Sequence, residues 1–364
     1  VRRRASRVRI TIDAAIEPPR ALPSDSAQPA QPWDGVRDCR EFGPIAPQGQ
    51  SPAVPIDRAF KIDEDCLSIN VWAPRPDGTP RPVMVWIHGG AYCLGSAAQT
   101  IYDGRHLAET GDVVLVSFNY RVGALGFLDL SAFSTADTVF ESNCGLRDQI
   151  AALEWVRDNI DAFGGDPSAV TVFGESSGAG SITTLMTCPS AEGLFHRAIA
   201  QSPPATSVYG AERAKTVAER FLELLSIDPE DAGDLLTTDL ELLVKASDDL
   251  VNEIPTRIPG TLAMAPVVDR DLVPHYPVAA FQKGYAHRIP LIIGSNKDEA
   301  SIFKFMKSPL MPVSAQSVEA MLQLLADDHP DISATKLAEI MSAYPDHAKP
   351  SGALALSRDR KSVV

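Results

Sequence analysis

The sequence predicts an α/β protein in which helices cover both faces of a mostly parallel sheet. Short apolar runs of strand length alternate with stretches whose apolar residues recur every three or four positions, which is the spacing of amphipathic helices. Two glycine-rich motifs each follow such an apolar run directly, HGGAY at 88–92 and GESSG at 174–178. Glycine-rich turns at strand ends of an α/β sheet are typical of ligand-binding and catalytic sites.

The first 32 residues differ in composition from the rest of the chain. Five arginines fall within the first nine positions, and a stretch rich in proline, alanine and serine follows. This segment has no apolar centre of the kind found in a secretory signal. We expect residues 1–32 to be poorly ordered. Because no linker or internal repeat interrupts residues 33–364, we expect them to belong to one domain.

Six runs of residues have the pattern of β-strands. In the first, 67–72, apolar residues alternate with Ser68 and Asn70, which predicts a half-exposed strand. The others are continuous apolar runs, which suit strands buried in a parallel sheet. They are residues 83–87, 113–118, 170–173, 198–201 and 290–294.

The residues between these runs predict helices. Apolar residues step by three and four from Leu146 to Ile160, and the FGGDP sequence at 163–167 then ends the helix. A second helix is expected from Ser176 to about Met186, after the GESSG turn. Further helical stretches are predicted at 212–252, 318–325 and 337–341.

The charge balance and the cysteine pattern exclude several classes of function. Lys and Arg number 33 against 47 Asp and Glu, so the net charge is -14 and the basic surface that binds nucleic acid is not expected. No apolar run approaches the roughly 20 residues that span a bilayer. The five cysteines form no CxxC pair, and neither glycine-rich loop is followed by the Lys-Ser/Thr pair of a phosphate-binding loop. We therefore expect no metal site and no cofactor.

The GESSG motif makes Ser176 the predicted nucleophile. A serine in a sharp strand-to-helix turn brings the residues two before and two after it close together, which explains glycine at 174 and 178. The turn exposes the serine hydroxyl beside a helix N-terminus, where a developing negative charge is favoured. The alternative is a glycine-rich helix start without reactivity.

The HGGAY motif predicts an oxyanion hole, a set of backbone N–H groups that bind the negatively charged oxygen of a reaction intermediate. Successive small residues let backbone N–H groups face a cavity without obstruction. Gly90 and Ala91 would donate from this loop, and Ser177 from the turn after the nucleophile. His88 precedes the nucleophile, whereas the triad order on such sheets is serine, acid, histidine. We therefore interpret His88 as a structural residue that holds the loop.

Four segments resemble type-B carboxylesterases of the cholinesterase family. They are EDCLSINVW at 64–72, VMVWIHGGAYCLGS at 83–96, the block from NCGLRDQ to FGESSGAGS at 143–181, and LFHRAIAQS at 194–202. The resemblance runs from about residue 33 to about residue 303. It implies an α/β-hydrolase fold and hydrolysis of small-molecule carboxylic esters through an acyl-serine intermediate.

The resemblance also implies an acid for the catalytic triad. In this family the acid is usually a glutamate that follows a buried strand, and the matching context here is GSNKDEASIF at 294–303. Glu299 is therefore the candidate acid, and its neighbour Asp298 is the alternative. A carboxylate at a strand end beside the nucleophile suits the orientation of an imidazole.

The sequence departs from the family pattern at one cysteine. The family pairs the cysteine of EDCL with one in an upstream FGPxCPQ, but this chain has FGPIAPQ at 42–48, with Ala46 in that place. Cys66 therefore lacks the expected partner. A bridge from Cys39 to Cys66 is the alternative to free thiols, and free thiols are favoured.

The ends of the chain depart from the pattern as well. No segment within 1–32 matches the aromatic-rich family sequence expected there, and the family's catalytic histidine lies well beyond the acid. The candidates for this histidine after Glu299 are His329 and His347, and both look like surface residues. We therefore expect the histidine beyond the chain end and residues 33–364 to be a partial domain. We expect the chain alone to be poorly soluble and nearly inactive.

Two functions fit these observations. The first is an esterase, which the intact turn around Ser176 and the HGGAY loop favour. The second is a catalytically dead hydrolase-fold module for binding or adhesion, which the missing histidine favours. The presence of Ser176 speaks against the second function.

Overall fold

The structure is a computed structural model of the whole chain. It describes residues 6–10, 34–35, 39, 41–51, 54, 56, 59–75, 77–257, 261–297, 299, 319–320, 322–323 and 333–342. No helix in these ranges is both long and apolar enough to span a membrane.

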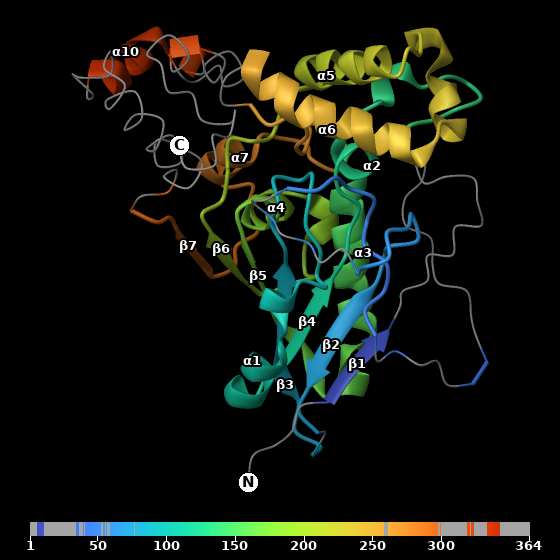
Figure 1. The fold of residues 1–364 in the computed structure, drawn as a ribbon. Coiled ribbons are helices and arrows are strands. Elements are labelled where there is room, and N and C mark those ends of the chain that lie inside the picture. Colours follow the sequence, from blue (N-terminus) through green and yellow to red (C-terminus); the bar gives the residue numbers. More distant parts are fainter. Residues whose placement is uncertain are drawn as a thin grey trace.

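Within the described residues, seven strands form one sheet in the order β1-β2-β4-β3-β5-β6-β7 (Figure 1). Strands β4, β3, β5, β6 and β7 are parallel to one another. At one edge, β2 pairs antiparallel with β4, and β1 pairs antiparallel with β2. The mostly parallel sheet expected from the sequence is therefore confirmed. The strands are β1 (Ser6–Ile10), β2 (Ile69–Ala73), β3 (Arg81–Ile87), β4 (Val114–Phe118), β5 (Gly165–Glu175), β6 (Arg197–Gln201) and β7 (Leu291–Gly294).

Helices cover both faces of the sheet. Apolar residues of α3 and α4 join the main core with Val85 and Val172, while Ala108 of α1 packs on Trp72 at the opposite face. The α-helices are α1 (Arg105–Gly111), α2 (Ala124–Phe127), α3 (Cys144–Asn159), α4 (Ser177–Leu185), α5 (Ala211–Leu224), α6 (Leu240–Arg257), α7 (Pro277–Lys283) and α10 (Ala334–Ser342). Short 3-10 helices are Thr100–Tyr102, Ser131–Phe133, Ile160–Phe163, Pro189–Ala191 and Pro229–Thr237.

The parallel strands point their carboxyl ends toward α5 and α6, which lie side by side beyond that edge (Figure 1). In open α/β sheets, ligands bind outside the carboxyl ends of the strands. The turns that follow β3, β5, β6 and β7 are therefore the place to look for a site.

Strand β2 differs from the half-exposed strand that the sequence predicts. All five of its residues are buried. The polar side chain of Asn70 does not face solvent. Its Nδ2 donates a hydrogen bond of 3.3 Å to Ser117 Oγ on β4. The same face carries Trp72, which α1 covers. Period-2 alternation marks a difference in polarity between two faces, and helices on both sides bury this strand.

Strand β1 lies within the segment 1–32 that we expected to be poorly ordered. Its five residues pair antiparallel with β2, from Ser6 opposite Ala73 to Ile10 opposite Ile69. Backbone pairing with a buried strand places these five residues in the sheet despite their composition. That residues 1–32 are poorly ordered stays a prediction. The other residues of that segment lie outside the described ranges, and the division into domains stays a prediction.

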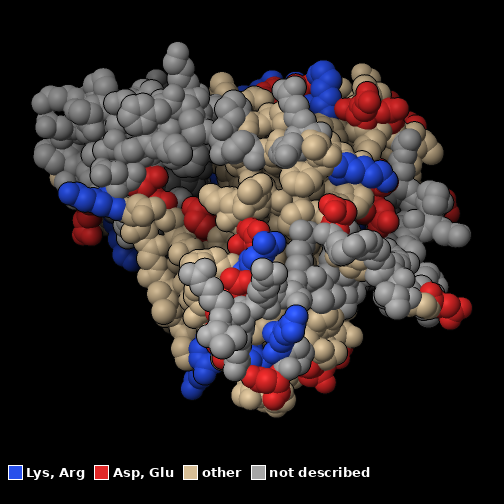
Figure 2. Space-filling view, turned by 60° about the horizontal axis from the view of Figure 1, so that its bottom comes forward, with Lys and Arg blue, Asp and Glu red and all other residues tan. Residues whose placement is uncertain are grey.

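The described cysteines bear on one further expectation, that Cys66 has no disulfide partner. Cys39 and Cys66 are both free thiols, as the sequence favours. On the face shown in Figure 2, basic side chains are interspersed with acidic ones.

Candidate active site

Ser176 occupies the turn between β5 and α4. Its backbone has φ 56° and ψ -125°, a conformation that a residue with a side chain adopts only at a cost. The surrounding structure holds this strain, because Ser176 N–H donates a 2.9 Å bond to the carbonyl of Gln201 at the end of β6. The Ser176 carbonyl accepts a 2.9 Å bond from Gly180 in α4. Among the described residues, none hydrogen-bonds to the Ser176 hydroxyl, which is partly exposed.

The two glycines of GESSG are required by close backbone approach. A methyl group on Gly174 would lie 2.7 Å from the carbonyl oxygen of Ile87 and 3.0 Å from the carbonyl carbon of Gly178. On Gly178 it would lie 2.2 Å from the same Ile87 oxygen. All three distances are shorter than the roughly 3.5–4.0 Å of an ordinary carbon contact. The glycines therefore let the end of β3 pack into the turn, in addition to relieving the crowding between the two positions.

The loop after β3 runs against the Ser176 turn. A methyl group on Gly89 would lie 3.2 Å from Ser176 Cβ. The next three residues have positive φ, at 124° for Gly90, 55° for Ala91 and 63° for Tyr92. The Gly90 carbonyl closes the loop by accepting 3.0 Å bonds from the next turn, at Cys93 and Leu94. We name residues 88–96 the glycine loop.

Three backbone N–H groups at this position have no acceptor inside the described part of the chain. The N–H groups of Gly90 and Ala91 donate to no residue within the described ranges. The N–H of Ser177 lies in the first turn of α4, where a helix provides no acceptor. Unpaired N–H groups beside a serine hydroxyl can stabilise an oxyanion.

His88 is the first residue of the glycine loop, and the sequence predicts that it holds this loop in place. It is buried and stacks on Tyr120 with ring centroids 4.2 Å apart. Its Nδ1 is 2.9 Å from the Gly89 carbonyl, so Nδ1 is assigned the proton, and Nε2 has no partner among the described residues. The Tyr120 hydroxyl donates a 2.6 Å bond to the His88 carbonyl. Burial lowers the pKa of His88 to about 4.

The buried His88 predicts loss of stability in mild acid. Because the pKa of His88 is about 4 in the folded chain and about 6.5 unfolded, the unfolded chain binds more protons between these values. The contribution to stability is complete above pH 6.5 and declines by up to about 3 kcal/mol as the pH falls toward 4. Urea unfolding from pH 8 to pH 4.5 measures this slope. It should become shallower in His88→Gln but not in His106→Gln, which removes an exposed histidine. Equal slopes in all three proteins would contradict the assignment.

Glu299 lies just beyond β7, and two donors fix its carboxylate. Its Oε2 accepts a 2.6 Å bond from the Asn296 backbone and a 2.9 Å bond from the Ser202 hydroxyl. Ser202 itself has φ 52° and donates from its backbone to the carbonyl of Gly294, at 2.7 Å. Ser202 was not singled out from the sequence as a site residue. The available signal was its position directly after a predicted buried strand.

The end of β6 connects the nucleophile to the candidate acid. The carbonyl that holds Ser176 belongs to Gln201, and the hydroxyl that holds Glu299 belongs to the next residue, Ser202. The turns after β5, β6 and β7 are thus joined in one network at one edge of the sheet. Asp298, the alternative acid, and the two candidate histidines His329 and His347 lie outside the described residues.

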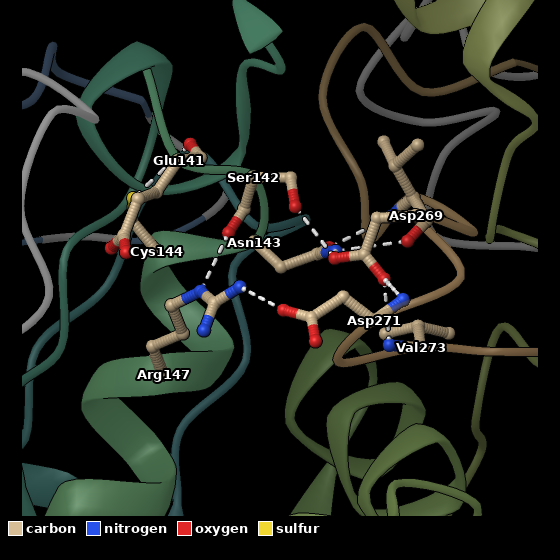
Figure 3. Close-up of polar contacts among 9 residues, drawn as sticks. Glu141, Ser142, Asn143, Cys144, Arg147, Asp269, Asp271 and Val273 are labelled. Atoms are coloured by element: carbon tan, nitrogen blue, oxygen red, sulfur yellow. Dashed lines mark hydrogen bonds and ion pairs between the residues drawn. The ribbon is translucent and has the colours of Figure 1, made fainter. Parts of the chain in front are cut away.

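A separate polar network ties the beginning of α3 to residues 267–273 (Figure 3). Asp269 Oδ2 accepts bonds of 2.6 Å from Ser142 Oγ and 2.7 Å from Asn143 Nδ2. Its Oδ1 accepts from the backbone N–H groups of Asp271 and Val273. Four donors on one carboxylate make this a rigid structural joint, and none of its bonds involves the glycine loop or Ser176.

The profile of the carboxylesterase family matches residues 21–351. The chain belongs to the carboxylesterase family. A para-nitrobenzyl esterase of Bacillus subtilis (strain 168) is 41% identical to this family member over 302 residues, which are 82% of this chain and 60% of that protein. Phenmedipham hydrolase of Pseudarthrobacter oxydans is 36% identical over 329 residues, 89% of this chain and 62% of that one.

Solved structures show the same fold. A PNB esterase gives a TM-score of 0.81 at 37% identity, covering 97% of this chain and 71% of that chain. A thermophilic PNB esterase gives 0.83 at 35% identity, with 98% and 72% covered. The α/β-hydrolase fold that the resemblance implies is therefore confirmed. This carboxylesterase-family chain spans 60–62% of the length of the two relatives compared by sequence.

Proposed function

We propose that this chain carries the acyl-transfer site of a carboxylic ester hydrolase, with Ser176 as the nucleophile. The observation that carries the proposal is the strained Ser176 turn, φ 56° and ψ -125°, with its hydroxyl unbonded among the described residues. Strain of this kind costs on the order of 1–3 kcal/mol and persists where function uses it. Membership in the carboxylesterase family supports the same reaction.

In the proposed reaction, Ser176 Oγ attacks the carbonyl carbon of a small-molecule ester while a base removes the hydroxyl proton. The carbonyl oxygen becomes an oxyanion and accepts bonds from the N–H groups of Gly90, Ala91 and Ser177. Collapse of the intermediate expels the alcohol, which receives the proton, and leaves an acyl-serine. Water then attacks the acyl carbon by the same route and releases the acid and the free serine.

Glu299 is proposed as the acid that orients the base, which on this fold is a histidine. The two donors on its Oε2 support a carboxylate of fixed direction at the same sheet edge as Ser176. His88 is not a candidate for the base, because its protonated Nδ1 is engaged by the Gly89 carbonyl and its Nε2 is buried. Burial also lowers its pKa to about 4, which makes it a weak base. We expect neither nucleic acid nor a cofactor to take part.

The relatives support an ester substrate of small size. Their names describe a para-nitrobenzyl esterase and a phenmedipham hydrolase. A binding module without catalysis would have no use for a strained, accessible serine beside unpaired N–H groups, and nothing observed in the described ranges favours it.

Covalent labelling tests the proposal. The chain is incubated with a fluorophosphonate probe, and p-nitrophenyl butyrate hydrolysis is followed in parallel. We expect one adduct per chain, located at Ser176 by peptide mass spectrometry. Labelling should remain measurable even with a weak base, because an oxyanion hole and substrate binding alone still accelerate acyl transfer about 10³–10⁴-fold over water. A fully folded chain that gains no adduct would refute the proposed function.

A further inference from the structure

Gln48 joins a distant segment of the chain to the glycine loop. Its side chain is only 6% exposed. The Gln48 Oε1 accepts a 2.7 Å bond from the N–H of Gly95, and its Nε2 donates a 2.9 Å bond to the carbonyl of the same glycine. A third bond, of 3.0 Å, runs from Nε2 to the Ala46 carbonyl. One side-chain amide thus satisfies both backbone groups of Gly95, as a neighbouring strand would.

Gly95 in turn supports the beginning of the glycine loop. Its φ is 114°, and a methyl group on it would lie 2.4 Å from the Gly89 carbonyl oxygen and 2.5 Å from His88 Nδ1. The two ends of the loop also meet at Gly90, where a methyl group would lie 2.0 Å from the carbonyl oxygen of Leu94. With no space between the two ends of the loop, a shift of Gly95 must move Gly89 and Gly90.

The segment that carries Gln48 is also held by bonds that do not involve this side chain. Its backbone is held by Ile45, which donates 2.9 Å to the Lys61 carbonyl and accepts 3.1 Å from Asp63. Asn119 Nδ2 also donates 3.0 Å to the carbonyl of Pro44. The buried amide of Gln48 therefore holds the glycine loop from a segment that other hydrogen bonds also keep in place.

We propose that Gln48 is a positioning residue that sets the direction of the Gly90 and Ala91 N–H groups through Gly95. The inference rests on the proposed function, in which those N–H groups bind the oxyanion. Gln48 acts through the loop and touches neither Ser176 nor the ester. Loss of its amide should lower the rate of acyl transfer to a greater degree than it lowers the amount of folded protein.

The test separates positioning from folding with two measurements. Urea unfolding gives the folded fraction of each protein. Because an irreversible probe also traps chains that refold during labelling, the fluorophosphonate labelling rate constant of the full chain is divided by that fraction before the proteins are compared. Gln48→Met keeps the length of the side chain and removes its hydrogen bonds, while Gln48→Glu keeps only the acceptor for Gly95. Val156→Ala, in the buried last turn of α3, is the matched control for destabilisation. Hydrogen–deuterium exchange of residues 88–96 is measured on the same proteins.

We expect Gln48→Met to lower the rate constant about 10–100-fold, since misplacement of about 1 Å can cost about 10²-fold and one lost oxyanion donor about 10²–10³-fold. Gln48→Glu should fall between Gln48→Met and the native chain and carries the comparison if the methionine variant labels too little. The glycine loop should exchange faster in both. Val156→Ala should change the folded fraction alone and leave the corrected rate constant unchanged.

The outcomes distinguish this inference from the proposed function. Native rate constants in both Gln48 variants, or unchanged exchange in the glycine loop, would overturn the positioning role while Ser176 labelling stands. No labelling of the native chain would instead overturn the proposed function. If the native chain is not labelled but the Gln48 variants exchange faster in the glycine loop, Gln48 still fixes the loop. If exchange is also unchanged, both the positioning role and the proposed function are wrong.

Discussion

Replacing Ser176 with alanine is expected to abolish both fluorophosphonate labelling and turnover of p-nitrophenyl butyrate while the chain stays folded. Ser176 Oγ is the atom that forms the covalent bond, so nothing remains to be labelled at this site. Loss of the triad serine costs about a millionfold in kcat in subtilisin, which bounds the effect on turnover. The hydroxyl makes no hydrogen bond to a described residue, so its removal should leave the thermal unfolding temperature nearly unchanged.

The matched control is Ser168→Ala. Ser168 is exposed near the other end of β5, the strand that leads into Ser176. This variant should label and turn over like the native chain. Turnover in Ser176→Ala within tenfold of native would remove Ser176 from the mechanism and assign the hydrolysis to another group.

The elements around Ser176 were predictable because local chemistry determines them. Glycine at 174 and 178 is demanded by backbone approaches shorter than 3 Å, which any sequence with this turn must satisfy. The helix predicted from Leu146 to Ile160 corresponds to α3 within two residues, because its apolar spacing continues to the FGGDP sequence that stops it. Such features depend on contacts between neighbours in the chain or on a single repeating face.

The contacts missed from the sequence connect residues far apart in the chain. Ser202 and Glu299 are 97 positions apart, and Gln48 and Gly95 are 47 apart. A lone polar residue has no periodic pattern, so its partner emerges only once the sheet order is known. The burial of Asn70 was missed for the same reason, because its partner on β4 and the helix that packs on the neighbouring Trp72 are distant in sequence.

In a chain that includes the catalytic histidine, replacing Glu299 with glutamine is expected to reduce ester turnover by up to about 10⁴-fold, the loss seen when a triad acid becomes an amide. The carboxylate is proposed to hold the imidazole in the productive tautomer and to stabilise its positive charge, and an amide can do neither. Glutamine keeps an oxygen for the N–H of Asn296 and the hydroxyl of Ser202, so the turn after β7 should stay in place. The measurement is kcat for p-nitrophenyl butyrate, with the labelling rate of Ser176 as a second readout.

Ser202→Ala and Asp298→Asn complete this series and decide the assignment of the acid. Ser202→Ala removes one of the two donors to Glu299 Oε2 described above, so it should lower kcat far less than Glu299→Gln, because the charge remains. Asp298→Asn should have little effect. Slow phosphonylation of Ser176 should persist in Glu299→Gln, since the carboxylate does not attack the probe and the oxyanion donors are unchanged. If Asp298→Asn lowered kcat more than Glu299→Gln, the acid would be Asp298, and the bond from Ser202 to Glu299 would serve only to shape the turn.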